Sequence, residues 1–151
     1  MTAVPEVLVA EHAIEYTYTR STGPIIGAFL TGLRDKQIKG IRAIDGRVIV
    51  PPVEYDPVTS DDLHELVDVG DAGVVTTWSW NATPVAGQPL DRPFAWALVR
   101  LDGADTGMLA AVDAGDEAQM HTGMRVRARW ADGRVGSIRD LLCFELEGDL
   151  A

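Results

Sequence analysis

The chain has one cysteine, three histidines and no long apolar run, and each scarcity excludes a class of protein. The single thiol, Cys143, rules out an intramolecular disulfide, and its apolar neighbours indicate a buried, unreactive side chain. No segment approaches the roughly 18 apolar residues that span a bilayer. The first residues also lack the basic and apolar regions of a secretory signal. We therefore expect a soluble, cytoplasmic protein.

Basic residues are scarce as well, because 13 lysines and arginines stand against 23 acidic residues and give a net charge of −10. Such a charge repels a phosphate backbone and removes the electrostatic attraction that dominates nucleic-acid binding. We therefore expect no nucleic-acid partner. The 151 residues contain no internal repeat and are 46% hydrophobic, which suits one compact domain with an N-terminal extension.

Groupings of catalytic residues are absent from the sequence. An enzyme needs a nucleophile or an acid–base group that supporting residues hold in place. The three histidines, His12, His64 and His121, fall in an arm, a turn and a loop. No Ser-His-Asp pattern, phosphate-binding glycine loop or pair of metal-binding histidines occurs. We expect a protein that is not itself an enzyme and has no catalytic residues.

The N-terminal segment predicts an extended arm followed by an amphipathic helix. Residues 14–18 alternate apolar and polar side chains, which places Tyr16 and Tyr18 on one face of the arm. Residues 21–24 then begin a helix that we expect to reach about Gln37. Its apolar stripe packs on the core or on a second protein, and the spacing leaves both open. The candidate partner interface comprises Tyr16, Tyr18, Ile25, Ile26, Phe29, Leu30 and Leu33.

Residues 42–59 have the frame of a zinc ribbon without its ligands. A zinc ribbon uses two short knuckles, C-x-x-C-G and C-P-x-C, whose four thiolates bind one ion. Gly46 and Pro57 keep the turn framework, and a Val-Ile-Val-Pro-Pro run separates the two knuckles. The four ligand positions are instead filled by Arg42, Asp45, Asp56 and Thr59.

These replacements do not suit zinc, because arginine is not a ligand, threonine is a poor one, and two aspartates do not replace four thiolates. We predict no structural zinc and no other cofactor in the chain. A salt bridge from Arg42 to Asp45 or Asp56 is expected to hold the two turns together instead. The alternative is an ordinary β-hairpin that turns at residues 45–46.

The remainder of the chain predicts a mainly β domain of five strands rich in β-branched, aromatic and alternating residues. A longer connection, residues 113–122, separates the third strand from the fourth. This order matches an OB-fold, a small partly open barrel, and a six-stranded barrel would give a similar pattern. The predicted strands cover residues 73–80, 94–101, 107–112, 124–130 and 141–146.

Two groups of side chains on these strands have more than one interpretation. Arg125, Arg127 and Arg129 share one face of the fourth strand. In the first interpretation they face solvent or form salt bridges with neighbouring carboxylates. In the second they contact a phosphate or an acidic partner. Trp78 and Trp80 also share a face, and OB-folds stack nucleic-acid bases on such aromatics. The acidic net charge favours core or protein contacts for the tryptophans.

The predicted order of arm, helix, two-knuckle ribbon and barrel divides the chain into residues 1–37, 38–65 and 66–151. Several short sequence segments, taken together in this order, carry a family resemblance. They are residues 45–52 and 56–57 of the ribbon, 73–75 at the start of the barrel, 93–102 in its second strand and 121–126 before its fourth. From about Gly23 to Glu147 the chain resembles the zinc-ribbon/OB-fold family called domain of unknown function thirty-five, with the zinc-ligand cysteines lost.

Members of this family look like accessory subunits of thiolase-fold enzymes, which include thiolases, lipid-transfer-protein-type thiolases and the retro-aldolases that shorten steroid side chains carried on coenzyme A. The resemblance implies a non-catalytic subunit that binds and stabilises such an enzyme in steroid or lipid side-chain degradation, with an acyl-CoA at the complex. It makes the coenzyme A phosphates a candidate contact of Arg125, Arg127 and Arg129. The alternative is an OB-fold module that binds acyl-CoA or another small ligand directly.

Overall fold

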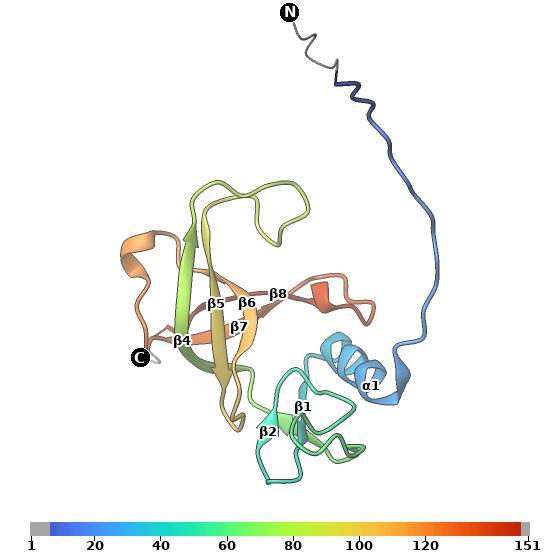
Figure 1. Ribbon diagram of the computed structural model, residues 1–151. Coiled ribbons are helices and arrows are strands. Elements are labelled where there is room, and N and C mark those ends of the chain that lie inside the picture. The colour runs from blue at the N-terminus through green and yellow to red at the C-terminus, as the bar shows by residue number, and fades with distance from the viewer. Residues whose placement is uncertain (1–6, 149–151) are drawn as a thin grey trace, which may run out of the picture.

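The computed structural model describes residues 7–148 and shows an extended arm, one α-helix, a small sheet and a β-barrel (Figure 1). The helix and the small sheet lie together beside one end of the barrel (Figure 1). The outermost parts of the predicted arm and barrel segments, residues 1–6 and 149–151, lie outside the described residues. Within residues 7–148, no helix has the length and apolar character needed to cross a membrane.

Helix α1 spans Gly23–Arg34 and stops three residues before the predicted end at Gln37. Pro24 suits its first turn, where a helix leaves N–H groups without intrahelical partners. The helix stops because Lys36 adopts a left-handed φ of 60°, and the amide of Gln37 then donates to the carbonyl of Gly32 at 2.8 Å. This arrangement is a Schellman C-cap, and it turns the chain directly into the first strand.

The small sheet contains strands β1 (Ile38–Arg42), β2 (Val48–Ile49) and β3 (Leu66–Val69) in the order β2-β1-β3. Strands β1 and β2 form an antiparallel hairpin whose turn is residues 43–46, centred one residue before the predicted 45–46, and the amide of Gly46 donates to the carbonyl of Ala43. Strand β3 pairs with β1 along its whole length. The hydrogen-bonded closed barrel begins with the next strand, at Ala72.

Five strands close the barrel in the order β4-β5-β6-β8-β7. The strands are β4 (Ala72–Asn81), β5 (Phe94–Leu101), β6 (Met108–Asp113), β7 (Arg125–Trp130) and β8 (Leu141–Leu146). Neighbouring strands are antiparallel except for β6 and β8, which pair in parallel. Short 3₁₀ helices, η1 (Glu117–Gln119) and η2 (Ile138–Asp140), precede β7 and β8. The predicted five-stranded OB-fold is confirmed, and each strand lies within one residue of its predicted bounds.

One continuous core joins the barrel interior to the helix. Phe29 and Leu33 are 3% and 0% exposed, and both belong to the same packed cluster as the inward-facing residues of the barrel. Ile25 is also buried, in a second cluster against the small sheet. These three residues were expected at a partner interface, and their burial in the chain's own core corrects that expectation. Ile26 and Leu30 are half-buried and keep part of their surface exposed.

Candidate partner-binding surfaces

The N-terminal arm, residues 7–22, runs out from the body of the molecule in an extended conformation (Figure 1). Tyr16 and Tyr18 are 78% and 76% exposed, and their ring centroids lie 6.2 Å apart. Residues 7–20 make no backbone hydrogen bond with another described residue. The arm therefore presents both predicted tyrosines together with a stretch of unpaired amides and carbonyls.

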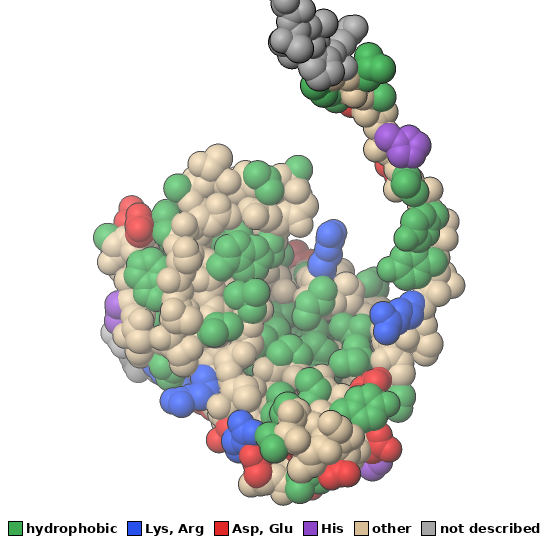
Figure 2. Space-filling view, viewed as in Figure 1, with side chains coloured by type: hydrophobic (Ala, Val, Ile, Leu, Met, Phe, Trp, Pro, Cys, Tyr) green, Lys and Arg blue, Asp and Glu red, His purple; other side chains and the backbone are tan. Residues whose placement is uncertain are grey.

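Apolar side chains on the arm are as exposed as the tyrosines. Val7, Leu8 and Val9 are 81–87% exposed, and Ile14 is 74% exposed (Figure 2). Isolated exposed apolar residues are common on soluble proteins, whereas a contiguous apolar segment marks a contact site. In the arm, residues 7–10 form a short contiguous apolar run, and residues 11–20 mix apolar with charged and polar side chains. The arm stands away from the body and is accessible along its described length (Figure 2).

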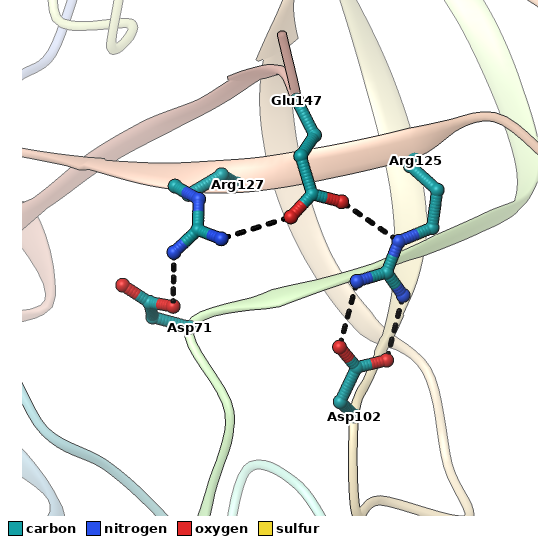
Figure 3. A network of polar contacts seen from close by, with 5 residues as sticks. All are labelled: Asp71, Asp102, Arg125, Arg127 and Glu147. Atoms are coloured by element: carbon teal, nitrogen blue, oxygen red, sulfur yellow. Dashed lines mark hydrogen bonds and ion pairs between the residues drawn. The ribbon is translucent and has the colours of Figure 1, made fainter. Parts of the chain in front are cut away.

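Arg125 and Arg127 on β7 lie in one network of ion pairs (Figure 3). Arg125 donates to both carboxylate oxygens of Asp102 at 2.7 Å and to Glu147 at 2.8 Å. Arg127 donates to the second oxygen of Glu147 at 2.9 Å and to Asp71 at 3.1 Å. Glu147 thus bridges the two arginines, and the network ties β7 to the chain before β4 and after β5 and β8.

Arg129, the third arginine of this face, is paired in the same way. It donates to Asp113 at 2.9 Å and to Glu145 at 3.1 Å, and Asp113 also receives a hydrogen bond from Arg92. The structure therefore shows the salt-bridge alternative for all three arginines. A phosphate group would have to compete with these carboxylates for the guanidinium groups, and contact with coenzyme A phosphates stays a prediction.

The ion pairs lower the pKa values of their acidic members. Hydrogen bonds from Arg125 hold the pKa of Asp102 and of Glu147 below the usual values, although partial desolvation opposes the shift. Burial raises the pKa of Asp113, but hydrogen bonds from Arg92 and Arg129 outweigh it and the net shift is downward. Since the folded pKa values lie below the unfolded ones, the network stabilises the fold above about pH 4 and loses this effect as the pH falls further.

Replacing Arg125 by glutamine should therefore lower the Tm by roughly 3 °C at pH 7, because paired surface charges contribute modestly to stability. The difference from the wild type should shrink as the pH falls from about 4 towards about 2, as the carboxylates of the network become protonated. Thermal melts of both proteins between these pH values measure it. The matched control is Arg100→Gln on β5, since Arg100 is exposed and has no ion pair within residues 7–148. A difference that persists unchanged at low pH would show that Arg125 acts through packing.

The knuckle region is held by contacts other than the predicted one. Arg42 donates to Glu65 at 2.8 Å and to the carbonyl of Gly46 at 3.1 Å, so the expected salt bridge to Asp45 or Asp56 is wrong. The physical reason is the pairing of β1 with β3, since the backbone amide of Arg42 also donates to the carbonyl of Glu65. Asp45 instead pairs with Arg47 at 2.7 Å, within its own turn.

A groove of about 470 Å³ lies on the outer face of the barrel, where β6 meets the loops that precede β5 and β8. Its walls are mostly apolar and include Trp96, Leu109 and Leu142, and Leu109 is 63% exposed. Figure 2 shows apolar side chains gathered around a hollow of this face. Arg139 is the charged residue of the lining, and it makes no ion pair with another described residue. The groove thus combines an apolar surface with one unpaired cation.

A buried carboxylate fixes one wall of this groove. Asp140 is 2% exposed and accepts backbone hydrogen bonds from Val135, Gly136 and Ser137, the shortest at 2.7 Å. Ser137 completes a capping box with Asp140 at the start of η2. Burial raises the pKa of Asp140, but the three backbone donors outweigh it and hold the pKa below its usual value. The loop that carries Arg139 therefore has a defined shape before any ligand arrives.

The thiol and the imidazoles of residues 7–148 lie in different environments. Cys143 is 1% exposed, and burial raises the pKa of its thiol to about 11, so the side chain is neutral and unreactive at pH 7, as expected. His12, His64 and His121 are exposed and lie in separate parts of the chain. Across the same residues, no three His, Cys, Asp or Glu side chains gather where they could hold a metal ion.

Comparison with known proteins identifies the class of this fold. Residues 66–131 match the family described as "ChsH2, C-terminal OB-fold domain", a range that runs from β3 to the end of β7. No curated protein matches the chain in sequence. This match, with the structural similarities below, shows that the barrel has the fold of the ChsH2 OB-fold domain.

Two solved structures have the same fold over most of the chain. A DUF35 protein of unknown function from Sulfolobus solfataricus has a TM-score of 0.56 and 23% identity, covering 71% of this chain and 78% of its own. A chain of the Ltp2–ChsH2(DUF35) aldolase has a TM-score of 0.59 and 16% identity, covering 84% of this chain and 98% of its own. The likeness to the aldolase chain therefore extends beyond the OB-fold barrel.

Proposed function

We propose that the chain is a non-catalytic accessory subunit that binds and stabilises a thiolase-fold enzyme acting on acyl-CoA. The observation that carries this proposal is the likeness to nearly the whole of a chain in the Ltp2–ChsH2(DUF35) aldolase, together with the match of the barrel to the ChsH2 domain. In this proposal the partner, a thiolase or a retro-aldolase, supplies the catalytic residues. The complex acts in steroid or lipid side-chain degradation.

The exposed surfaces support a binding role for the chain. The arm offers apolar side chains and unpaired backbone groups, which a partner can cover by adding the segment to a sheet edge or a groove. At the base of the arm, Ile26 lines a hollow together with Pro52 and Tyr55 of the knuckle region. One continuous candidate interface therefore comprises the arm, the exposed part of α1 and the knuckles. It replaces the predicted interface, which included the buried residues Ile25, Phe29 and Leu33 of α1.

The proposal is tested by co-expressing the full chain with thiolase-like proteins encoded near it and purifying through a tag on the partner. We expect a stable complex, and acyl-CoA cleavage that requires both chains. The partner alone should be less soluble or less active, since a stabilising subunit binds only its folded form. If the partner is stable and fully active without the chain, and the two do not co-purify, the accessory role is wrong.

The groove on the barrel favours a second function, direct binding of an acyl-CoA or a similar amphipathic anion. Its apolar walls suit an acyl chain, and the unpaired guanidinium of Arg139 suits an anionic group at its margin. Calorimetric titration of the isolated chain with a long-chain acyl-CoA measures this affinity. Leu109→Glu should weaken binding by about 30-fold, because a charge would enter the apolar wall. Ile44→Glu is the matched control, since Ile44 is 61% exposed in a distant turn.

The two functions give different results in these experiments. Under the accessory role, the isolated chain has no measurable affinity for the acyl-CoA, and Leu109→Glu leaves complex formation through the arm unchanged. Under the direct-binding role, the isolated chain titrates with the acyl-CoA and needs no partner. Cleavage of the acyl-CoA by the chain alone would contradict both.

A further inference from the structure

The two knuckle turns each close by their own backbone hydrogen bonds. In the first turn, the amide of Ala43 donates to the carbonyl of Arg47 at 2.8 Å. In the second, the amide of Asp56 donates to the carbonyl of Asp61 at 2.8 Å, and Ser60 adopts a left-handed φ of 64°. These bonds give each turn its shape but do not connect one turn to the other.

The side chain of Asp56 makes the connection between the turns. One carboxylate oxygen accepts a hydrogen bond from the amide of Ile44, in the first turn, at 2.9 Å. The other accepts from the amides of Val58 and Thr59, in the second turn, at 2.8 Å and 3.0 Å. Asp56 is 4% exposed, so the three bonds are shielded from water. A carboxylate bound by several backbone amides is a strong, directional link.

The donor set at the four knuckle positions does not fit zinc. Both oxygens of Asp56 are occupied by amides, and Asp45 is held by Arg47. Arg42 carries a positive charge and is held by Glu65. The hydroxyl of Thr59 accepts from the amide of Asp61 at 3.4 Å. Zinc ribbons require thiolate or imidazole ligands, and these positions offer neither.

We infer that the Asp56 carboxylate takes the place of a metal ion in this chain, joining the two knuckles into a metal-independent clamp. A zinc ion in a ribbon draws two turns together through four thiolates. Here one buried carboxylate draws the same two turns together through three backbone amides. The knuckle region therefore keeps the ribbon shape without depending on metal supply or on the reduced state of cysteines.

The first test uses the purified full chain, with zinc present during expression. We expect less than about 0.1 zinc per chain by mass spectrometry. Folds that depend on a bound metal unfold when a chelator removes it, whereas the Tm of this chain should change by less than about 1 °C. One zinc per chain, or a fall of the Tm with chelator, would overturn the inference.

The second test follows the three amides directly by hydrogen exchange. In chelator-treated wild-type protein, the amides of Ile44, Val58 and Thr59 should exchange at least about 100-fold more slowly than unprotected amides. In Asp56→Asn the uncharged amide group accepts more weakly, and the same three amides should exchange about 10-fold faster than in the wild type. Fast exchange in the wild type would overturn the inference whether or not the variant folds.

The matched control is Asp61→Asn, which removes the same charge from the same turn. The side chain of Asp61 is exposed and makes no hydrogen bond with another described residue, so its replacement should leave the three amides unchanged. Equal effects of the two substitutions would show that the charge of the turn matters and the carboxylate clamp does not.

Discussion

Replacing Tyr16 and Tyr18 by serine should weaken binding of the proposed thiolase-fold partner by about 100-fold and leave the isolated chain as stable as the wild type. Exposed tyrosines at interfaces often contribute about 2 kcal/mol each, and the two effects do not add fully. Stability should not change, because both rings are more than three-quarters exposed and touch no core residue. Titration of the purified partner with each variant measures the affinity, and thermal melts of the chain measure the stability.

The matched control for this prediction lies on the opposite face of the same arm. Thr17 and Thr19 alternate with the tyrosines, so replacing both by serine keeps the length and polarity of the segment. We expect this control to bind within about threefold of the wild type. Loss of binding in the threonine control but not in the tyrosine variant would place the contact on the other face. Full affinity in both variants would remove the arm from the interface.

Replacing Gly73 by alanine should destabilise the barrel by about 3 kcal/mol, the upper part of the range for overpacked sites. A Cβ atom at this position would lie 2.4 Å from the carbonyl oxygen of Arg100 and 2.8 Å from the Cα atom of Leu101. Both atoms belong to the backbone of β5, which cannot move away without breaking its pairing with β4. The Tm should fall by roughly 10 °C, as measured by thermal unfolding.

Gly133 provides the control for this substitution. A Cβ atom there would meet no other atom within 4 Å, so Gly133→Ala should change the stability by less than about 0.5 kcal/mol. A Gly73→Ala protein that melts within about 2 °C of the wild type would mean that β4 and β5 separate easily. The close approach also gives a physical reason for glycine at the start of the barrel, in the Gly73-Val74-Val75 piece.

The barrel strands could be predicted from the sequence because their patterns are local. β7 alternates arginines with apolar residues, and β5 and β8 have the predicted bounds, since each is a short run of mostly apolar residues. Trp78 and Trp80 are half-buried against the main core, which fits the core interpretation. The pairing partners are not local, and so the assignment of β3 to the small sheet was missed.

The candidate sites were less predictable for the same reason. Arg125 meets Asp102 and Glu147 across more than twenty residues of sequence, and no local spacing indicates such a pair. The groove combines four separate segments, and its single sequence signal is an apolar residue, Leu109, at an outward-facing strand position. An apolar helical stripe has the same pattern whether it faces its own core or a partner. The burial of Phe29 could therefore be established only from the structure.

The position of β8 in the closed barrel has a consequence for how the protein is made. β8 lies between β6 and β7 in the barrel. Until β8 has been synthesised, β6 and β7 therefore each have one unpaired edge. Open strand edges are the usual starting points of wrong pairing and aggregation. The arm leaves the ribosome more than a hundred residues before β8 does. A partner that captures the arm during translation thus meets an unfinished barrel, whereas one that arrives after release meets a closed one.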